Sequence, residues 1–264
     1  MAERAAGAND PRLAPLRMRE RQLHTIADRR TDGAAGRFVA EGDLVVERAV
    51  AAGCEPELLL CSESVAVRLE PLVAGLGCTV LVADEDVRRE ATGLGVALGA
   101  IGTFRRPAPR TASDVLATAR RIVVLDRVDN PGNVGAIART AVALGWDALL
   151  LERTSADPLA RRALRTSMGA ALSLPWARTD DLAGTVARLV HDGVELVALD
   201  PDGSADASTL PPAARRAVVL GAEREGVDPA VASACTVNAR IPMASGTDSL
   251  NVAAAAAVAC WLLR

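Results

Sequence analysis

The chain has 264 residues, a length typical of one large domain or two modest ones. Half of the residues are hydrophobic and 24% are charged, which excludes a disordered chain, and the net charge of −3 argues only weakly against a nucleic-acid partner. Because no apolar run approaches the ~18–20 residues of a membrane span and the first residues lack a signal-peptide segment, we expect a cytoplasmic protein without a membrane partner.

Missing and rare residue types exclude several kinds of chemistry. All 30 basic residues are arginine, so a Walker A phosphate loop and a Schiff-base lysine are excluded. The absence of tyrosine, with only two phenylalanines and three tryptophans, disfavours an aromatic platform for stacking RNA bases. Two histidines and five cysteines without a CxxC pair fit neither a zinc site nor a disulfide framework, so we expect no metal.

The basic residues are unevenly distributed along the chain. Residues 1–40 hold eight arginines against five acidic residues, a local net charge of +3. Such a segment can form a phosphate-binding patch, and it can equally be the solvated face of an amphipathic helix. Both interpretations stay open from the sequence.

The first part of the chain predicts a small α/β unit. Residues 44–50 follow a helical pattern, and Gly53 ends it. The short apolar runs at 58–61 and 79–82 are bounded by turn residues, which indicates buried strands.

A linker is expected between this unit and the remainder of the chain. Residues 93–102 are glycine-rich and apolar, but their glycine spacing departs from the dinucleotide-binding fingerprint, which favours a loop or a helix-packing segment. Prolines among arginines then follow, and they can continue neither a helix nor a central strand. We therefore expect the linker near residues 103–113.

Strands and helices alternate through the second half. Apolar strands of this kind predict a mostly parallel sheet that is covered by helices on both faces. The predicted strands are 121–128, 147–152, 195–200, 217–221 and 237–242, and the predicted helices are 132–145, 181–191 and 250–263.

The first strand of this half leads into a polar turn and a helix. Asp126 and Asp129 follow the carboxyl end of the strand, where open α/β sheets build their sites. The residues from Asn130 to Asn133 are turn formers that open the helix, and Arg139 lies less than two helical turns further on. An ordinary strand–turn–helix connection with a solvated Arg139 explains this segment equally well when it is considered alone.

Two further polar, glycine-bearing loops leave strands in the same half. One spans residues 220–229, and the other spans residues 241–255 and opens the last helix. Ser249 is the expected N-cap of that helix, with Asn251 in its first turn. Three such loops in one half of a chain favour a shared site.

Together these loops resemble the motifs of the SpoU/TrmH family of RNA ribose 2′-O-methyltransferases. The first motif of that family is similar to NPGNVGAIARTA, the second to VVLGAEREG and the third to IPMASGTDSLNVAAA, in the same order and spacing. The L30e-like substrate domain common in rRNA-directed members begins with a stretch similar to RFVAEGDLVVERAV, residues 37–50. The resemblance covers residues 37–264 and is weak between residues 65 and 119.

The resemblance implies an α/β fold with a trefoil-knotted, SPOUT-like methyltransferase domain and a smaller N-terminal domain. It places an L30e-like RNA substrate-binding domain at residues 1–107 and the knotted SpoU methyltransferase domain at residues 108–264. The implied cofactor is S-adenosylmethionine, held in a bent form largely through backbone groups of the knot loops. The implied cofactor-binding positions are Gly221, Ile241 and Leu250, with Ala198 and Leu199 as weaker candidates.

The resemblance also implies catalytic positions. Arg139 matches the residue that acts on the 2′-hydroxyl. Because an arginine pKa lies above ~12, electrostatic stabilisation of the developing alkoxide is favoured over proton abstraction, although the role as base stays open. Asn133 and Glu223 would orient or shape the site, and Ser249 and Asn251 would hold the knot loop and the target nucleotide.

Partners follow from the same comparison of motifs. RTSMGA, residues 165–170, resembles another family stretch, so Arg165 is a candidate RNA phosphate contact, and an exposed helix face explains it equally well. Family members are typically homodimers. We therefore expect a homodimer, to which the apolar C-terminal helix contributes unless it is part of the core.

The favoured substrate is RNA, and among RNAs the 23S rRNA, because of the L30e-like N-terminal stretch. A tRNA 2′-O-methyltransferase is less favoured, since the known tRNA type generally lacks this domain. A resistance-type enzyme acting on large-subunit rRNA shares every motif and stays open. A non-catalytic RNA-binding factor is a more distant alternative, against which the intact motif positions argue, and an NAD-dependent enzyme is the most distant.

Overall fold

The computed structural model describes residues 2–18, 36–93, 95–244 and 249–264, and the structural statements below concern these ranges. The chain forms two compact units. The first consists of Met1–Pro109 and Leu159–Ser173, and the second of Arg110–Pro158 and Leu174–Arg264. The sequence predicted a single division between residues 107 and 108, and it gave no sign that residues 159–173 pack with the first unit.

Two sequence predictions involve residues outside the described ranges. Much of the basic segment at residues 1–40 falls in 19–35, and part of the third motif falls in 245–248. The structure therefore does not bear on these parts.

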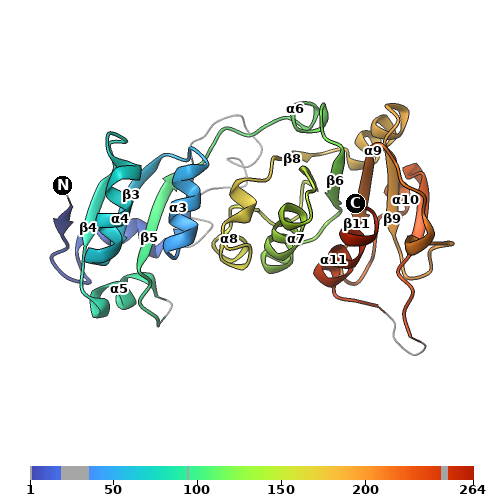
Figure 1. Ribbon diagram of the computed structural model, residues 1–264. Helices are drawn as coiled ribbons and strands as arrows, with labels where there is room; N and C mark the ends of the chain where they lie inside the picture. The colour runs from blue at the N-terminus through green and yellow to red at the C-terminus, as the bar shows by residue number, and fades with distance from the viewer. Residues whose placement is uncertain (1, 19–35, 94, 245–248) are drawn as a thin grey trace. The chain divides into compact units, whose positions relative to one another are not determined.

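The first unit contains a mixed five-stranded sheet in the order β1-β4-β3-β5-β2 (Figure 1). The pairings β1–β4 and β4–β3 are parallel, whereas β3–β5 and β5–β2 are antiparallel. Its strands are β1 (Glu3–Arg4), β2 (Arg37–Glu41), β3 (Pro56–Cys61), β4 (Thr79–Val82) and β5 (Ala100–Arg105). Its helices are η1 (Pro11–Arg17), α3 (Asp43–Ala51), α4 (Glu63–Val73), α5 (Glu85–Thr92), α8 (Arg161–Thr166) and η2 (Ala170–Leu172).

The predicted linker begins too early, because its first residues belong to strand β5. Phe104 of β5 pairs with Phe38 of β2, and their buried rings stack with centroids 5.3 Å apart. Gly102 lies where a Cβ atom would come within 2.4 Å of the Leu59 side chain, so the glycine serves close packing inside a sheet. The irregular connection is limited to the residues between β5 and helix α6 (Ala112–Leu116).

Helix α8 is attached to strand β2 by a buried carboxylate. Glu41 ends β2 with its side chain 1% exposed. Its two oxygens accept hydrogen bonds from Arg161 Nε and Arg165 Nη1, both at 2.7 Å. Arg161 also donates to the carbonyl oxygens of Leu16 and Met18, which connects α8 to the end of η1. These bonds explain why α8 belongs to the first unit.

The second unit contains a seven-stranded sheet in the order β10-β12-β9-β11-β6-β7-β8, and all of its pairings are parallel. This agrees with the predicted parallel sheet, although β8 and β10 were not predicted. The strands are β6 (Arg121–Leu125), β7 (Ala148–Glu152), β8 (Trp176–Thr179), β9 (Glu195–Leu199), β10 (Ala205–Asp206), β11 (Arg216–Leu220) and β12 (Val237–Arg240). With α6, the helices are α7 (Pro131–Ala143), α9 (Leu182–His191), η3 (Ala207–Thr209), α10 (Pro229–Ala234) and α11 (Val252–Leu262).

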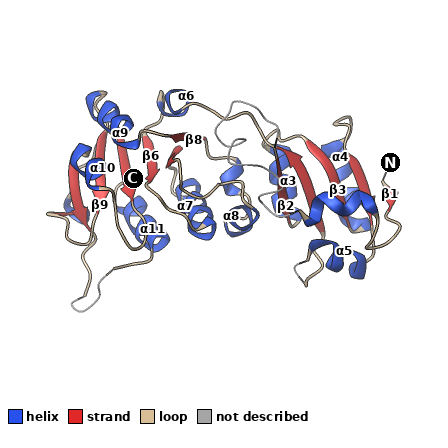
Figure 2. Cartoon of the chain, turned by 180° about the vertical axis from the view of Figure 1, so that it is seen from behind, coloured by secondary structure: helices blue, strands red, loops and turns tan. Residues whose placement is uncertain are grey.

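Helices cover both faces of this sheet. Ile122 and Val124 of β6 belong to a buried cluster with residues of α6, α9 and α10. Because side chains alternate along a strand, Val123 and Leu125 face the other way, and both are fully buried. Figure 2 shows α7 and α11 side by side on the face opposite α9 and α10. No helix in the described ranges is long and apolar enough to span a membrane.

The strand order determines where the loops meet. Strand β11 lies between β6 and β9, and β12 lies between β9 and β10, so both insert between strands that precede them in the chain. The neighbouring strands β12, β9, β11 and β6 are parallel, so their carboxyl ends share one edge of the sheet. The loops that follow these four strands therefore gather at that edge.

Candidate active site

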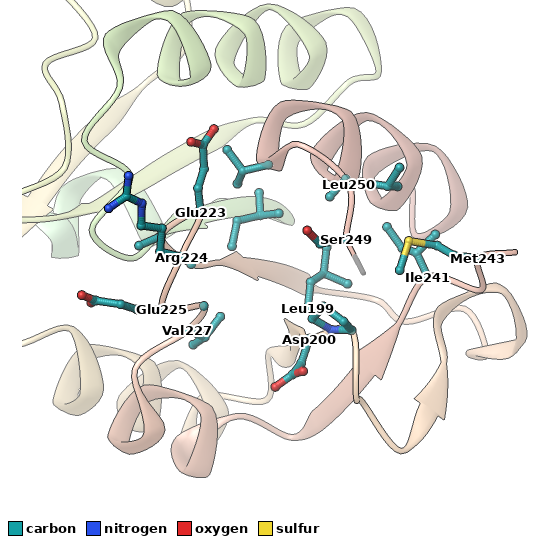
Figure 3. Close-up of a pocket in the computed structure, with 17 residues that line it drawn as sticks. Leu199, Asp200, Glu223, Arg224, Glu225, Val227, Ile241, Met243, Ser249 and Leu250 are labelled. Atoms are coloured by element: carbon teal, nitrogen blue, oxygen red, sulfur yellow. The ribbon is translucent and has the colours of Figure 1, made fainter. Parts of the chain in front are cut away.

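A cavity of about 350 Å³ opens at this edge of the sheet. Three segments line it: residues 199–201 after β9, residues 220–227 at the end of β11, and residues between 241 and 255 around the start of α11. Figure 3 shows Glu223, Arg224 and Glu225 on one side of the cavity and Ile241 and Met243 on the other. The cavity thus combines an apolar wall with a charged loop.

The carboxylate of Glu223 connects the three motifs. Its Oε1 atom accepts hydrogen bonds from Nδ2 of Asn133 at 2.6 Å and from Nδ2 of Asn251 at 3.0 Å. Distance along the chain does not predict this meeting, because the three residues belong to α7, the loop after β11 and the start of α11. The two amides fix one oxygen of Glu223 at the cavity wall.

Helix N-termini position both asparagines. Asn130 is the N-cap of α7 and accepts the N–H of Gly132 at 2.9 Å, which sets Asn133, 9% exposed, in the first turn. Asn251 is the N-cap of α11, because its Oδ1 accepts the N–H of Ala253 at 3.0 Å. The prediction that Ser249 caps this helix is therefore wrong. Asn251 uses its oxygen for the helix and its amino group for Glu223.

The loop after β11 is a tight turn that requires glycine. Ala222 and Gly226 exchange two backbone hydrogen bonds, of 3.1 and 2.9 Å. Gly226 has a φ of +68°, a conformation that favours glycine. A Cβ atom at Gly221 would lie 2.0 Å from the carbonyl carbon of Gly226, so any side chain there would displace the turn. The turn therefore depends on both glycines.

Comparison with known proteins identifies the family. The model of the SpoU rRNA Methylase family matches residues 120–261, which is more than half of the chain. The chain belongs to the SpoU rRNA methylase family. The resemblance inferred from the three motifs is thereby confirmed.

SpoU relatives match nearly the whole chain. An uncharacterized tRNA/rRNA methyltransferase of Mycobacterium bovis is 38% identical over 96% of this chain and 88% of its own length. The 23S rRNA (guanosine(2553)-2′-O)-methyltransferase RlmP of Bacillus subtilis is 30% identical over 92% of this chain and 94% of its own.

Solved structures of SpoU relatives show a similar fold. The AdoMet-bound rRNA methyltransferase from Sinorhizobium meliloti has a TM-score of 0.81 at 26% identity, over 98% of this chain and 95% of its own. The SpoU methyltransferase AviRb from Streptomyces viridochromogenes, in complex with AdoMet, has a TM-score of 0.77 at 25% identity, over 94% and 96%. The SpoU methyltransferase fold predicted from the sequence is therefore present, and two relatives bind this cofactor in their crystals.

The SpoU cavity contains most of the positions expected to bind the cofactor. Gly221, Ile241, Leu250 and Leu199 all line it. Ala198, the other weaker candidate, does not line the cavity and is buried within β9. Among the expected catalytic residues, Glu223 and Ser249 line the cavity, and Asn133 and Asn251 reach it through Glu223.

The structure does not bring the two arginine candidates into this cavity. Arg139 lies exposed on α7, does not line the cavity, and makes no hydrogen bond or ion pair with another described residue. Arg165 belongs to the first unit, where Glu41 holds it. Both roles therefore stay predictions.

Sequence reasoning missed several residues of the SpoU cavity. Asp200 and Met243 line it, and they come directly after β9 and close after β12. The available signal was their position at carboxyl ends of predicted strands, the same signal that drew attention to Asp126.

The cysteines are unsuited to nucleophilic chemistry. Burial raises the pKa of the Cys61, Cys235 and Cys260 thiols to about 12 and that of Cys54 to about 11, which keeps them protonated at neutral pH. Within the described ranges, no group of three or more histidine, cysteine, aspartate or glutamate side chains is placed to hold a metal ion.

Proposed function

We propose that the protein transfers the methyl group of S-adenosylmethionine to a ribose 2′-oxygen of RNA in the cytoplasm, with 23S rRNA as the substrate. The observation that carries this proposal is the shared bonding of Asn133 and Asn251 to Glu223 at the cavity wall. It joins the three loops that the family motifs mark. The near full-length similarity to RlmP of Bacillus subtilis supports the 2′-oxygen and the 23S rRNA.

The residues of the cavity suit S-adenosylmethionine. Leu199, Ile241 and Leu250 offer an apolar wall for an adenine ring. Asp200 and Glu223 place carboxylates on the lining, where they suit the ligand's positive charge and its ribose hydroxyls. S-adenosylmethionine supplies a methyl group on a positively charged sulfur, which makes the carbon open to attack by an oxygen.

The protein's part in the reaction is to orient groups and to stabilise charge. Two donors on Oε1 of Glu223 leave its Oε2 without a hydrogen bond from another described residue, so this oxygen can accept one from the substrate. A guanidinium is a planar fork of hydrogen-bond donors, which suits Arg139 to contact an oxygen that gains negative charge. We assign it the stabilisation of negative charge that develops on the 2′-oxygen.

A second copy of the chain is part of this proposal. Val258, Trp261 and Leu262 expose apolar surface on one side of α11, and Trp261 is 55% exposed. On α7, which packs against α11, Val142 is also exposed and lies one helical turn beyond Arg139. Docking of a second copy on this face would bring Arg139 to the interface between the copies.

The topology favours a knotted chain. Because β11 and β12 insert between earlier strands, the loops around them have to pass other loops at the same sheet edge. We propose that this arrangement is the trefoil knot expected from the family.

We further propose that the first unit binds RNA as an L30e-like domain. In residues 159–173 of this unit, Arg162 and Arg165 of α8 are exposed. Arg48 of α3 donates a 2.6 Å hydrogen bond to the carbonyl oxygen of Met168, just beyond α8. Among the described residues, Glu41 is the one carboxylate bonded to these three arginines, through Arg165. Arginines with spare donors suit RNA phosphates.

Cofactor binding and methyl transfer test the proposal together. In calorimetry with EDTA present, the protein should bind S-adenosylmethionine, and Gly221→Ala should not, because the added Cβ displaces the turn. With a tritiated methyl group, 23S rRNA should gain label and tRNA should not. Binding of NAD instead of S-adenosylmethionine would contradict the assignment, and label on tRNA alone would exclude the rRNA substrate.

A further inference from the structure

The loop that carries Glu223 is attached at both ends to a single residue, Asp126. The backbone N–H of Asp126 donates to the carbonyl oxygen of Leu220 at 2.8 Å, immediately before the loop. Its Oδ2 accepts the backbone N–H of Asp228 at 2.6 Å, immediately after the loop. Residues 221–227 therefore start and end on Asp126, and each of these seven residues lines the cavity.

Arg127 holds the same loop at its tip. Its Nη1 donates to Oε2 of Glu225 at 2.6 Å, and its Nη2 lies 3.5 Å from the carbonyl oxygen of Gly226. The other side of the guanidinium faces Asp126, with Nε 3.3 Å from Oδ1. One planar group thus connects the buried carboxylate to the exposed tip, which a flexible point charge cannot do.

The backbone of Arg127 is bent to make this contact. Its φ is +55°, and within the described residues only Met168 shares a positive φ among non-glycine residues. Such a conformation is unfavourable for a side chain with a Cβ atom and persists where the surroundings enforce it. Asp126 is 2% exposed, so Arg127 also supplies the charge that this buried carboxylate needs.

The charges around Arg127 come from both segments. Hydrogen bonding by Asp126 raises the pKa of Arg127, and the charges of Glu225 and Asp228 raise it further. Three carboxylates therefore face one guanidinium. Together they favour the charged form of Arg127.

We propose that Asp126 and Arg127 are positioning residues of the methyltransferase. They hold residues 221–227 in the conformation that completes the cofactor cavity and presents Glu223 to Asn133 and Asn251. Neither residue lines the cavity, so both act through the loop. This inference rests on the proposed cofactor site.

The test measures S-adenosylhomocysteine affinity by calorimetry and hydrogen exchange by mass spectrometry on the full chain. Arg127→Ala should weaken the affinity at least about fivefold, the loss expected for one charge-assisted contact. Exchange should become faster in peptides that cover residues 221–228 and stay unchanged elsewhere. Arg127→Lys should give an intermediate affinity, because an ammonium group can pair with Glu225 or Asp126 but not reproduce both contacts.

Two further variants complete the design. Asp126→Asn keeps the side-chain shape but removes the charge opposite Arg127, so it should loosen the same peptides and weaken affinity in the same direction. Arg153→Ala is the matched control, because it removes an exposed ion pair with Asp180 in the same unit, and it should leave affinity and exchange unchanged.

The outcomes separate this inference from the proposed function. Wild-type affinity and wild-type exchange in Arg127→Ala would overturn the positioning role, as would faster exchange throughout the second unit, which indicates general destabilisation. If Gly221→Ala also binds S-adenosylhomocysteine normally, the cavity is not the cofactor site and the proposed function fails with it. If only Gly221→Ala loses binding, the site stands and Arg127 has no part in it.

Discussion

Asn133 and Asn251 share one acceptor: their Nδ2 atoms lie 2.6 and 3.0 Å from Oε1 of Glu223. Asn133 is buried in the first turn of α7, and Asn251 caps α11, so two helix N-termini converge on one carboxylate. Positive helix N-termini and amide donors both favour a negative charge at this place. The two hydrogen bonds orient the Glu223 carboxylate at the cavity wall.

Asn251 has two functions that one substitution can separate. Asn251→Ser should keep the N-cap, since serine caps helices well, but should lose the hydrogen bond to Glu223. We expect a melting temperature close to wild type and methyl transfer lowered about tenfold or more. Asn251→Ala should lose the cap as well, at a cost of about 1 kcal/mol. Full activity in Asn251→Ser would show that the bond to Glu223 has no catalytic value.

Substitution of Arg139 tests whether this exposed residue takes part in catalysis. As an exposed residue without a bonded partner among the described residues, Arg139→Ala should change the free energy of unfolding by no more than ~0.5 kcal/mol. Single-turnover methyl transfer should nevertheless fall ~100-fold or more with cofactor affinity nearly intact. Arg139→Lys should remain poor, because lysine lacks the planar fork.

The matched control for Arg139 is Arg188→Ala. Arg188 is also an exposed arginine on a helix of the second unit, but it lies on α9, on the opposite face of the sheet. The Arg188→Ala protein should retain wild-type turnover. Wild-type rates in a folded Arg139→Ala protein would remove Arg139 from the mechanism.

Substitution of Trp261 tests whether a second copy of the chain docks on α11. Trp261→Glu places a charge on the exposed apolar side of α11 and removes the ring beneath the Arg264 guanidinium, 3.4 Å from the centroid. Sedimentation equilibrium should show a dimer for wild type and a monomer for the variant. Val67→Glu, at a more exposed site on α4, is the control and should leave the dimer intact. A wild-type protein that stays monomeric at all concentrations would contradict the dimer.

Glu41 tests how the first unit holds α8. Glu41→Gln removes a buried charge from Arg161 and Arg165, and we expect the free energy of unfolding in urea to fall by about 3 kcal/mol. Asp86→Asn breaks an ion pair whose carboxylate is 91% exposed and should cost no more than about 0.5 kcal/mol. Equal losses of unfolding free energy in the two variants would show that the buried ion pair contributes no more to stability than the exposed one.

The contact of Glu41 with Arg161 and Arg165 also affects experiments in which one unit is produced without the other. A protein that starts near Thr111 keeps α8 but loses Glu41 and the rest of β2, so Arg161 and Arg165 would lose their carboxylate partner and a packing face would become exposed. Loss of RNA binding in such a protein would not by itself assign RNA recognition to the first unit. Substitution of Arg48 and Arg162 in the full chain avoids this difficulty.

Periodicity and apolar runs predicted the strands that are buried on both faces. Strands β6, β9 and β11 are continuous apolar runs bounded by turn residues, and they appear close to the predicted positions. Strand β5 was not predicted, because glycine is typical of loops and the close packing of Gly102 against Leu59 is not visible in the sequence. Strand β8 is short and follows a proline, which gives little pattern to detect.

The residues of the site could be predicted from the sequence, but their arrangement in space could not. The motifs named Asn133, Glu223 and Asn251, but their meeting depends on β11 lying beside β6, which no local pattern reveals. The association of residues 159–173 with the first unit has the same origin. It depends on the burial of Glu41, a long-range contact that composition does not signal.

The proposed reaction is methyl transfer to a ribose 2′-oxygen of 23S rRNA. The most direct measurement incubates 23S rRNA with the protein and S-adenosylmethionine that carries a deuterated methyl group, then analyses the nucleosides by mass spectrometry after nuclease digestion. We expect one labelled nucleoside with the methyl group on its ribose, formed by wild type and nearly absent with Arg139→Ala. A methyl group on a base, or unlabelled rRNA beside labelled tRNA, would contradict it.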